Sequence, residues 1–190
     1  MSVSVNFARV KDKAIIPSKR DEDMGFDIYA CFDEDYIEIL PHETKLIPTG
    51  IASACDPGYG FVLFERGSTG SKGIARRCGV IDSGYRDEWF VGITNSTDKR
   101  LYISKIPAEK FIEEAYKDDI TKAYDLVFGS LLGTMEEFIK ENVIIYPYEK
   151  AIVQALVLPV PKTIVNEMSY EDLKNIKSER GMGALGSSNK

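Results

Sequence analysis

Short apolar runs, interrupted every few residues by glycine, proline, aspartate or asparagine, are the feature that most limits the fold of this chain. The run SVSVNF alternates Val3, Val5 and Phe7 with polar residues, and a period of two is typical of a strand with one buried face. Similar runs follow at close intervals: YIEIL, KLIPTGIASA, GFVLFE, CGVID, WFVGIT, RLYISKI, NVIIYP and AIVQALVLPV. The sequence therefore predicts a mostly β chain with one system of sheets.

One stretch, about 107–142, has helical periodicity instead. Pro107 suits the first turn of a helix, and Gly129 and Gly133 mark a break between two helices. Apolar pairs recur at helical spacing: Phe111/Ile112, Ala115/Tyr116, Ala123/Tyr124, Val127/Phe128, Leu131/Leu132 and Phe138/Ile139. We expect a helical insertion whose apolar stripe packs on the sheets or is offered to another chain.

The C-terminal region is predicted to be a short helix followed by a mobile tail. SYED, from Ser169, supplies a capping residue and early acidic residues for the helix. The tail, about 178–190, reads SERGMGALGSSNK and is rich in glycine and serine. With 190 residues, of which 44% are hydrophobic, the chain is predicted to form a single domain, 1–190.

Charge and cysteine usage exclude several classes of protein. A net charge of −6 and a pI near 5.0 argue against a nucleic-acid partner, which requires a clustered basic surface. No segment approaches a membrane-spanning length, so no membrane partner is expected. Three widely spaced cysteines fit a reducing, cytoplasmic compartment, and His42, the only histidine, excludes a multi-histidine zinc site.

Two stretches combine arginine with glycine and hydroxyl residues. ERGSTGSKGI, residues 65–74, places Arg66 before a loop that can expose backbone N–H groups to an anion. The tail repeats this chemistry after Arg180. A third stretch, CGVIDSGYR, sets Asp82 in an apolar run, where it could cap a hairpin turn or serve in catalysis. The pattern points to phosphate handling more than to acyl chemistry.

Five stretches in order resemble the five motifs of the trimeric deoxyuridine triphosphatases (dUTPases): MGFDIYA, ERGSTGSKGI, CGVIDSGYRDE, AIVQALV and SERGMGALGSS. The resemblance spans nearly the whole chain except the helical insertion, which falls between the third and fourth motifs. It implies a jelly-roll β-barrel that hydrolyses dUTP to dUMP and pyrophosphate with Mg²⁺, limits uracil in DNA and supplies dUMP for thymidylate synthesis. It also implies a homotrimer in which the subunits share each active site.

The resemblance gives roles to individual residues of the third and first motifs. Asp82 would orient and activate the attacking water, which a carboxylate can do by accepting a proton. Tyr85 would lie under the deoxyribose, and Gly79 and Ile81 would belong to the hairpin whose backbone reads the uracil edge. Asp27 would reach the metal through water. Because some phage-encoded members carry a helical insertion, a bacterium or phage-infected host cell is a plausible source.

Other residues would hold the triphosphate. Arg66 and Ser68 would bind phosphates, and Gln154, polar within AIVQALVLPV, looks like the glutamine that contacts the phosphate chain. The alternative for Gln154 is an edge-strand residue that faces solvent. In the tail, Arg180 would clamp the γ-phosphate, and the closing segment would add donors from Gly183, Gly186 and Ser187.

Three positions depart from the family pattern. Asp87 replaces a usual glycine of the third motif, which would lengthen or twist the hairpin. Gly67 follows Arg66 where the family usually has serine, so phosphate contact falls to its backbone or to Ser68. Leu185 stands where a phenylalanine normally stacks on uracil, and leucine cannot supply π-stacking. We expect Trp89 or Phe90 to provide the missing aromatic lid, and core packing is the alternative for both.

Two other functions are compatible with this scaffold. A dCTP deaminase would need a glutamate at the position of Gly92, so no deamination is expected. A regulatory protein on a dUTPase scaffold would bind a protein partner through the helical insertion, with hydrolysis secondary.

Overall fold

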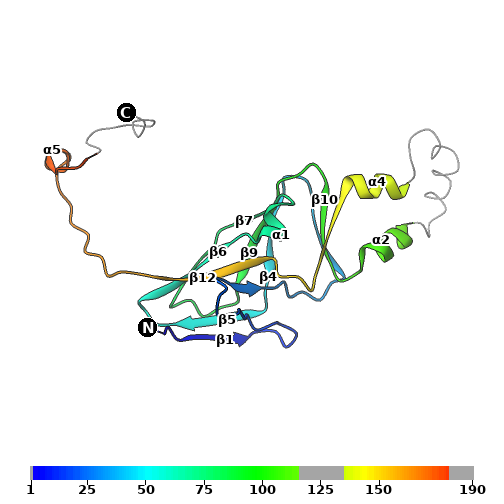
Figure 1. The fold of residues 1–190 in the computed structure, drawn as a ribbon, viewed down its shortest axis with the longest axis horizontal. Coiled ribbons are helices and arrows are strands. Elements are labelled where there is room, and N and C mark those ends of the chain that lie inside the picture. Colours follow the sequence, from blue (N-terminus) through cyan, green and yellow to red (C-terminus); the bar gives the residue numbers. More distant parts are fainter. Residues whose placement is uncertain (1, 116–134, 180–190) are drawn as a thin grey trace. The chain divides into compact units, whose positions relative to one another are not determined.

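The computed structural model describes residues 2–115 and 135–179, and strands dominate it (Figure 1). The strands are β1 (Val5–Arg9), β2 (Phe26–Ile28), β3 (Tyr36–Ile39), β4 (Thr44–Pro48), β5 (Ile51–Cys55), β6 (Tyr59–Phe64), β7 (Ile74–Arg77), β8 (Val80–Asp82), β9 (Phe90–Asn95), β10 (Arg100–Ser104), β11 (Val143–Pro147) and β12 (Val153–Pro159). The helices are α1 (Gly67–Gly70), α2 (Ala108–Ala115), α4 (Met135–Asn142) and α5 (Tyr170–Asn175). Within the described residues, no helix is long and apolar enough to cross a membrane.

The strands pair into several small sheets. Their orders are β1-β5, β11-β10-β3, β2-β12-β6-β8 and β4-β9-β7. Antiparallel pairing prevails, but β10 and β11 run parallel. Parallel neighbours cannot be joined by a tight hairpin and need a crossover connection. The segment with α2 and α4 supplies this crossover, so the helical stretch occupies a position that the sheet topology requires.

The core is apolar and rich in aromatic rings. Trp89 is fully buried, and its ring packs edge-on against Phe61 at 5.0 Å and Phe7 at 5.8 Å between centroids. Side chains from most strands, among them Ile28, Ile39, Ile47, Ile93, Leu101 and Ile103, surround these rings with at most 1% of their surface exposed. This packing fixes the strands that carry the site.

Every strand-like run of the sequence contains a strand, and two strands were missed. KLIPTGIASA holds two strands, β4 and β5, because Gly50 between them adopts a φ of +67°, which favours glycine. The strand β2 is only three residues long, and β7 reads IARR, so neither shows a period of two. Both are held in place by longer neighbours, β12 and β9.

The two described helices α2 and α4 fall inside the stretch predicted to be helical. Phe111 on α2 packs against the rings of Tyr102, at 4.9 Å, and Tyr36, at 5.7 Å. This position therefore packs on β10 and β3. Residues 116–134, with the break predicted at Gly129 and Gly133, lie outside the described residues.

The chain separates into two compact units, Met1–Val160 and Pro161–Lys190. The boundary comes before the tail predicted from about 178, and the single domain 1–190 stays a prediction. In the second unit, α5 begins after Ser169, whose hydroxyl accepts a hydrogen bond from the Asp172 amide at 3.0 Å, as the capping pattern predicted. The tail residues Arg180, Gly183, Leu185, Gly186 and Ser187 lie outside the described residues.

Candidate functional site

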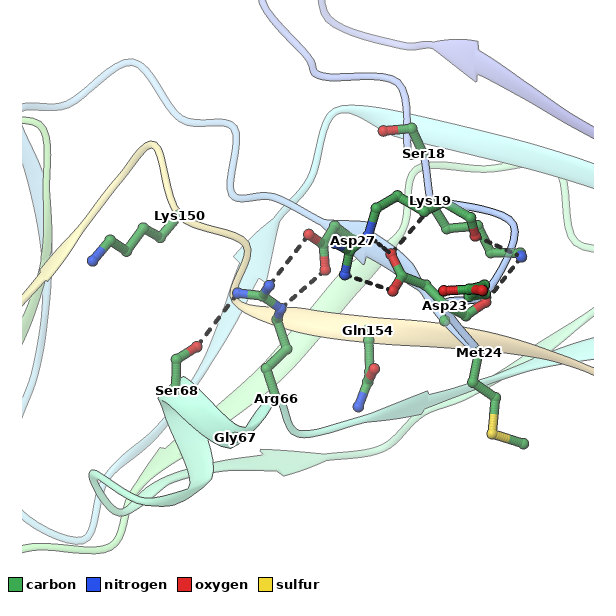
Figure 2. Close-up of a pocket in the computed structure, with 13 residues that line it drawn as sticks. Ser18, Lys19, Asp23, Met24, Asp27, Arg66, Gly67, Ser68, Lys150 and Gln154 are labelled. Carbon is green, nitrogen blue, oxygen red and sulfur yellow. Dashed lines mark hydrogen bonds and ion pairs between the residues drawn. The ribbon is translucent and has the colours of Figure 1, made fainter.

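The strand pairing around β12 brings three distant segments to one pocket. Gln154 on β12 lies opposite Asp27 on β2 and, on its other side, opposite Phe64 at the end of β6. Arg66 follows two residues after Phe64. The resulting cavity, of about 960 Å³, is drawn in Figure 2 and is lined by Ser18, Lys19, Arg20, Glu22, Asp23, Met24, Gly25, Asp27, Arg66, Gly67, Ser68, Lys150 and Gln154. The pocket thus unites residues of the first, second and fourth motifs.

Arg66 and Asp27 form a two-pronged ion pair inside this pocket. The Arg66 Nε atom lies 2.9 Å from Asp27 Oδ1, and Nη2 lies 3.3 Å from Oδ2 (Figure 2). Nη1 makes longer contacts with the Ser68 hydroxyl, at 3.4 Å, and the Ala151 carbonyl, at 3.5 Å. About a third of each charged side chain is exposed. The pair fixes the plane of the guanidinium while leaving it open to a ligand.

Gln154 is held in a single orientation. Its Nε2 donates a hydrogen bond to the Glu65 carbonyl at 2.9 Å. The strand β12 has neighbours on both sides, so the expectation of an edge strand does not hold. A Cβ atom on Gly25 would lie 3.0 Å from Gln154 Oε1, closer than nearly all such contacts. The glycine of the first motif therefore gives the glutamine its space.

The loop after Arg66 is ordered even though it begins with glycine. The Arg66 amide donates to the Thr69 hydroxyl at 3.0 Å, and this hydroxyl donates to the Arg66 carbonyl at 3.0 Å. Thr69 is buried, whereas Gly67 and Ser68 are exposed to the pocket. A Cβ atom on Gly67 would have no neighbour within 4 Å. Nothing in the packing therefore requires glycine at this position.

The pocket can accept a magnesium ion that is brought by a substrate. Across 2–115 and 135–179, no group of three or more histidine, cysteine or acidic side chains could hold a metal by itself. Mg²⁺ keeps several waters and often uses one or two carboxylates together with substrate phosphates. Asp27, neutralised by Arg66 but partly exposed, suits contact through water. Asp23 is engaged by Arg20 at 2.8 Å, and this hydrogen bond lowers the pKa of the Asp23 carboxyl.

A second group of candidate residues lies on the hairpin that contains β8. Asp82 pairs with Gly60 on β6, and the Gly79 carbonyl accepts a hydrogen bond from the Leu63 amide at 2.7 Å. A Cβ atom on Gly79 would lie 2.9 Å from the Arg76 guanidinium. A side chain at this position would have to displace the flexible end of Arg76, and Ile81 follows in a half-buried position.

The tip of this hairpin is exposed and partly apolar. The Tyr85 amide donates to the Asp82 carbonyl at 3.0 Å, and the Tyr85 hydroxyl donates to the Glu88 carbonyl at 3.0 Å. A small cavity of about 170 Å³ is lined by Val80, Ile81, Asp82, Tyr85 and Phe90. The structure thus groups Ile81, Asp82 and Tyr85 with one of the two aromatic candidates.

The two candidates for an aromatic lid differ sharply in burial. Trp89 has no exposed surface and belongs to the core, so its ring is not available to cover a base. Phe90 is 46% exposed and lines the cavity beside Asp82. Alternation along a strand explains the difference, because successive side chains point to opposite faces. Phe90 is therefore the candidate that we retain.

The two groups of residues are well separated within one chain. Asp82 and Gln154 pair with β6 from opposite sides, opposite Gly60 and Phe64 respectively. Four residues along the strand and two strand spacings place their Cα atoms roughly 16 Å apart. Within one chain, Asp82 and Gln154 accordingly line two different cavities.

Sequence reasoning missed the cations that complete the pocket. Lys19, Arg20 and Lys150 all line it. Lys150 stands four residues before Gln154, in the turn that leads into the fourth motif. This closeness to the fourth motif is the sequence feature that could have indicated Lys150 as a pocket residue. Lys19 and Arg20 belong to a charged loop before the first motif, where the composition alone looks like a solvated surface.

Gly92 leaves no room for the glutamate of a deaminase. A Cβ atom at this position would lie 2.7 Å from the Arg77 carbonyl oxygen on β7. Even alanine would therefore push the two strands apart. This close approach agrees with the expectation that the chain does not deaminate dCTP.

Comparison with known proteins gives a consistent result. The model of the dUTPase family matches residues 11–106. A deoxyuridine 5'-triphosphate nucleotidohydrolase of Neisseria meningitidis is 38% identical over 79 residues, 40% of this chain and 52% of the relative. Those of Thiobacillus denitrificans and Klebsiella pneumoniae are 32% identical over 93 residues and 30% over 107, which cover 47% and 54% of this chain. The chain spans 62% and 68% of their lengths.

Solved structures show the same fold at lower identity. The dUTPase of Staphylococcus bacteriophage 80alpha with dUpNHpp has a TM-score of 0.64 at 18% identity, covering 98% of this chain and 99% of that one. The EIAV dUTPase has a TM-score of 0.56 at 18% identity, covering 88% and 98%. These likenesses support the jelly-roll architecture. The family model over residues 11–106, which include Asp27, Arg66 and Asp82, and the Klebsiella relative lead to one conclusion: the chain belongs to the dUTPase family.

Proposed function

We propose that this protein hydrolyses dUTP to dUMP and pyrophosphate, thereby limiting uracil in DNA and supplying dUMP. The observation that carries the proposal is the convergence of Arg66, Ser68 and Gln154 in one pocket from separate segments of the chain. Family membership and the names of the curated relatives support the same reaction. We also propose a cytoplasmic location, in a bacterium or a phage-infected cell.

The pocket residues bind and orient the triphosphate. The guanidinium of Arg66, fixed by Asp27, presents N–H groups to phosphate oxygens, and a planar fork suits two-point contact. The Ser68 hydroxyl and the Gln154 amide add neutral donors, and Gly67 leaves its backbone open. Mg²⁺, held through water by Asp27, would neutralise charge on the triphosphate. Orientation of this kind supplies much of the catalysis of phosphoryl transfer.

Asp82 acts on the attacking water. Its carboxylate is exposed, so water reaches it, and it accepts the proton as the water attacks the α-phosphorus. Tyr85, anchored through its hydroxyl to Glu88, offers a ring for the deoxyribose. The backbone at Gly79 and Ile81 reads the uracil edge, where an unpaired buried group would penalise cytosine.

The protein works as a homotrimer with shared active sites. The separation of roughly 16 Å between the Cα atoms of Asp82 and Gln154, which line different cavities, supports a site in which a second copy supplies one of them. Several exposed apolar side chains, among them Leu46, Val80 and Phe90, agree with a surface that another copy covers. Each active site is then formed by Asp82 of one copy and Gln154 of another.

A protein partner at the helical insertion remains the alternative function. A cavity of about 570 Å³ between α2, α4 and β11 favours it, with both apolar and charged residues in its lining. Packing of Phe111 on Tyr102 favours a structural role instead. Replacing 108–142 by a flexible linker long enough to join β10 to β11 distinguishes these. Intact hydrolysis would support an accessory role for the insertion, whereas loss of the trimer would mean that it is structural.

Product analysis tests the reaction. Purified protein with Mg²⁺ is incubated separately with dUTP, dCTP, dTTP and UTP, and the Asp82→Asn variant serves as the control. We expect monophosphate and pyrophosphate from dUTP alone, and none from the variant. Survival of dUTP, or equal turnover of all four nucleotides, would contradict the proposal.

A further inference from the structure

We propose that Lys150 is a second phosphate-binding cation of the pocket and acts with Arg66 on the triphosphate. The inference deepens the proposed function and rests on it, because the ligand is the polyphosphate of a nucleotide. It comes from four observations: the pairing of the other cations, the few N–H groups that Arg66 has left, the anchoring of the Lys150 turn, and the charge of the chain.

The first observation is that the other cations of the pocket are already paired. Lys19 donates to the carbonyls of Asp23 and Arg20, at 2.9 and 3.1 Å. Arg20 holds the Asp23 carboxylate, and Arg66 holds Asp27. For Lys150, no hydrogen bond or ion pair of the ammonium exists with any described residue, and no dashed line reaches it in Figure 2. It is the one pocket cation in the described structure that can meet a ligand without first leaving a partner.

The second observation is that Arg66 has little capacity left. A guanidinium has five N–H groups. In Arg66, Nε and Nη2 each donate one N–H to Asp27, and Nη1 makes the contacts with Ser68 and Ala151. One Nη2 N–H is therefore left for an oxygen of the ligand, and any second contact requires the long Nη1 contacts, at 3.4 and 3.5 Å, to be exchanged. One arginine in this state cannot balance a triphosphate.

The third observation is that the backbone beside Lys150 is fixed while its side chain is exposed. The Lys150 amide donates to the Pro147 carbonyl at 3.1 Å, which closes the turn before β12. The adjacent Ala151 is 2% exposed, and its carbonyl accepts from the Tyr146 hydroxyl at 2.7 Å and from Arg66. Arg66 therefore contacts the turn that presents Lys150, whose exposed side chain lines the pocket.

The fourth observation is charge. The whole chain carries −6, and three carboxylates line the pocket itself: Glu22, Asp23 and Asp27. A triphosphate approaching this surface is repelled unless cations gather locally. Lysine is a compact point charge on a flexible stem and suits one phosphate oxygen, whereas arginine suits two-point contact. Lys150 is positioned to supply the charge that Asp27 removes from Arg66.

The test measures binding of dUpNHpp with Mg²⁺ to four proteins by titration calorimetry. They are the wild type, Lys150→Gln, Lys150→Arg and Lys99→Gln, which removes an exposed lysine outside the pocket lining. We expect Lys150→Gln to weaken binding about 10- to 100-fold, as for loss of a charged hydrogen bond. Lys150→Arg should stay within about threefold and Lys99→Gln within about twofold of the wild type.

A second readout separates charge from structure. Deoxyuridine, which has no phosphate, should bind the wild type and Lys150→Gln equally, and the salt dependence of dUpNHpp binding should be shallower in Lys150→Gln. If Lys150→Gln and the wild type bound dUpNHpp with equal affinity, or if Lys150→Gln weakened binding of dUpNHpp and deoxyuridine equally, the role of Lys150 would be overturned and the proposed function would stand. If the wild type bound no dUpNHpp and did not hydrolyse dUTP, the proposed function would fall and this inference with it.

Discussion

The pocket around Arg66 and the hairpin around Asp82 differ in how completely one chain builds them. In the pocket, Arg66, Asp27 and Gln154 all have partners within the chain, and β12 is flanked on both sides. At the hairpin, Val80 is 74% exposed, Phe90 is 46% exposed and Asp82 faces solvent. Folding of one chain thus gives the pocket residues their partners, whereas the hairpin residues stay exposed and free to contact a ligand or another chain.

This difference has a physical reason. Side chains that orient a polyphosphate act best when they are already fixed, and the fold holds Arg66 and Gln154 through partners within the chain. Apolar and catalytic groups that act only in an assembled site gain nothing from burial in the monomer. We therefore expect variants of the pocket to alter phosphate binding within one chain, and variants of the hairpin to act across a subunit boundary.

The sharpest test of the comparison mixes two inactive variants. Asp82→Asn removes the base and should lower kcat about 10²- to 10⁴-fold, and Arg66→Gln should be similarly impaired through loss of phosphate orientation. If Asp82 and Arg66 of one site come from different chains, random mixed trimers restore roughly a quarter of the sites. We expect activity of the co-refolded mixture near that fraction of wild type.

The control for this experiment is co-refolding each variant with itself, which should restore nothing. Gel filtration and circular dichroism should show that both variants assemble and fold. A mixture no more active than its parents would show that one chain supplies both residues, and the shared-site proposal would have to be abandoned.

Sequence reasoning located most of the strands and identified the motifs, but it could not provide three facts. Alternating apolar residues predict strands well, whereas β2 and β7 are strands only because β12 and β9 pair with them. The cluster of Asp27, Arg66 and Gln154 follows from register, which single segments do not encode. Burial of Trp89 beside exposed Phe90 depends on which face of β9 meets the core.

Gly25→Ala tests whether the pocket depends on space beside Gln154. The new methyl group would lie 3.0 Å from Gln154 Oε1 and 3.2 Å from Leu156, so the glutamine must shift. We expect KM for dUTP to rise about tenfold with a smaller change in kcat, since misplaced contacts weaken binding. Gly58→Ala is the matched control, because a Cβ atom there meets nothing within 4 Å. Equal kinetics of the two variants would contradict this account.

Phe90→Ala tests whether the ring of Phe90, beside the hairpin, covers the uracil base. Loss of an aromatic contact should raise KM for dUTP about 2- to 10-fold and leave kcat nearly unchanged. Leu173→Ala, which shortens an exposed apolar side chain on α5, is the control, and sedimentation velocity should report an unchanged oligomer for both. A KM equal to that of the wild type would remove Phe90 from the site. Dissociation of the Phe90 variant would instead assign the ring to the interface.

Gly67→Ser should have the smallest effect and tests whether the pocket is already complete. A Cβ atom at this position has no neighbour within 4 Å, so the substitution costs nothing in packing, and serine is more favourable than glycine in the short helix α1. A hydroxyl beside Ser68 adds a donor to a pocket whose guanidinium is largely occupied by Asp27. We expect KM for dUTP to fall about two- to fivefold, with Gly58→Ser unchanged. A rise in KM would mean that the ligand needs the bare backbone of Gly67, and that the pocket excludes a side chain there by function and not by packing.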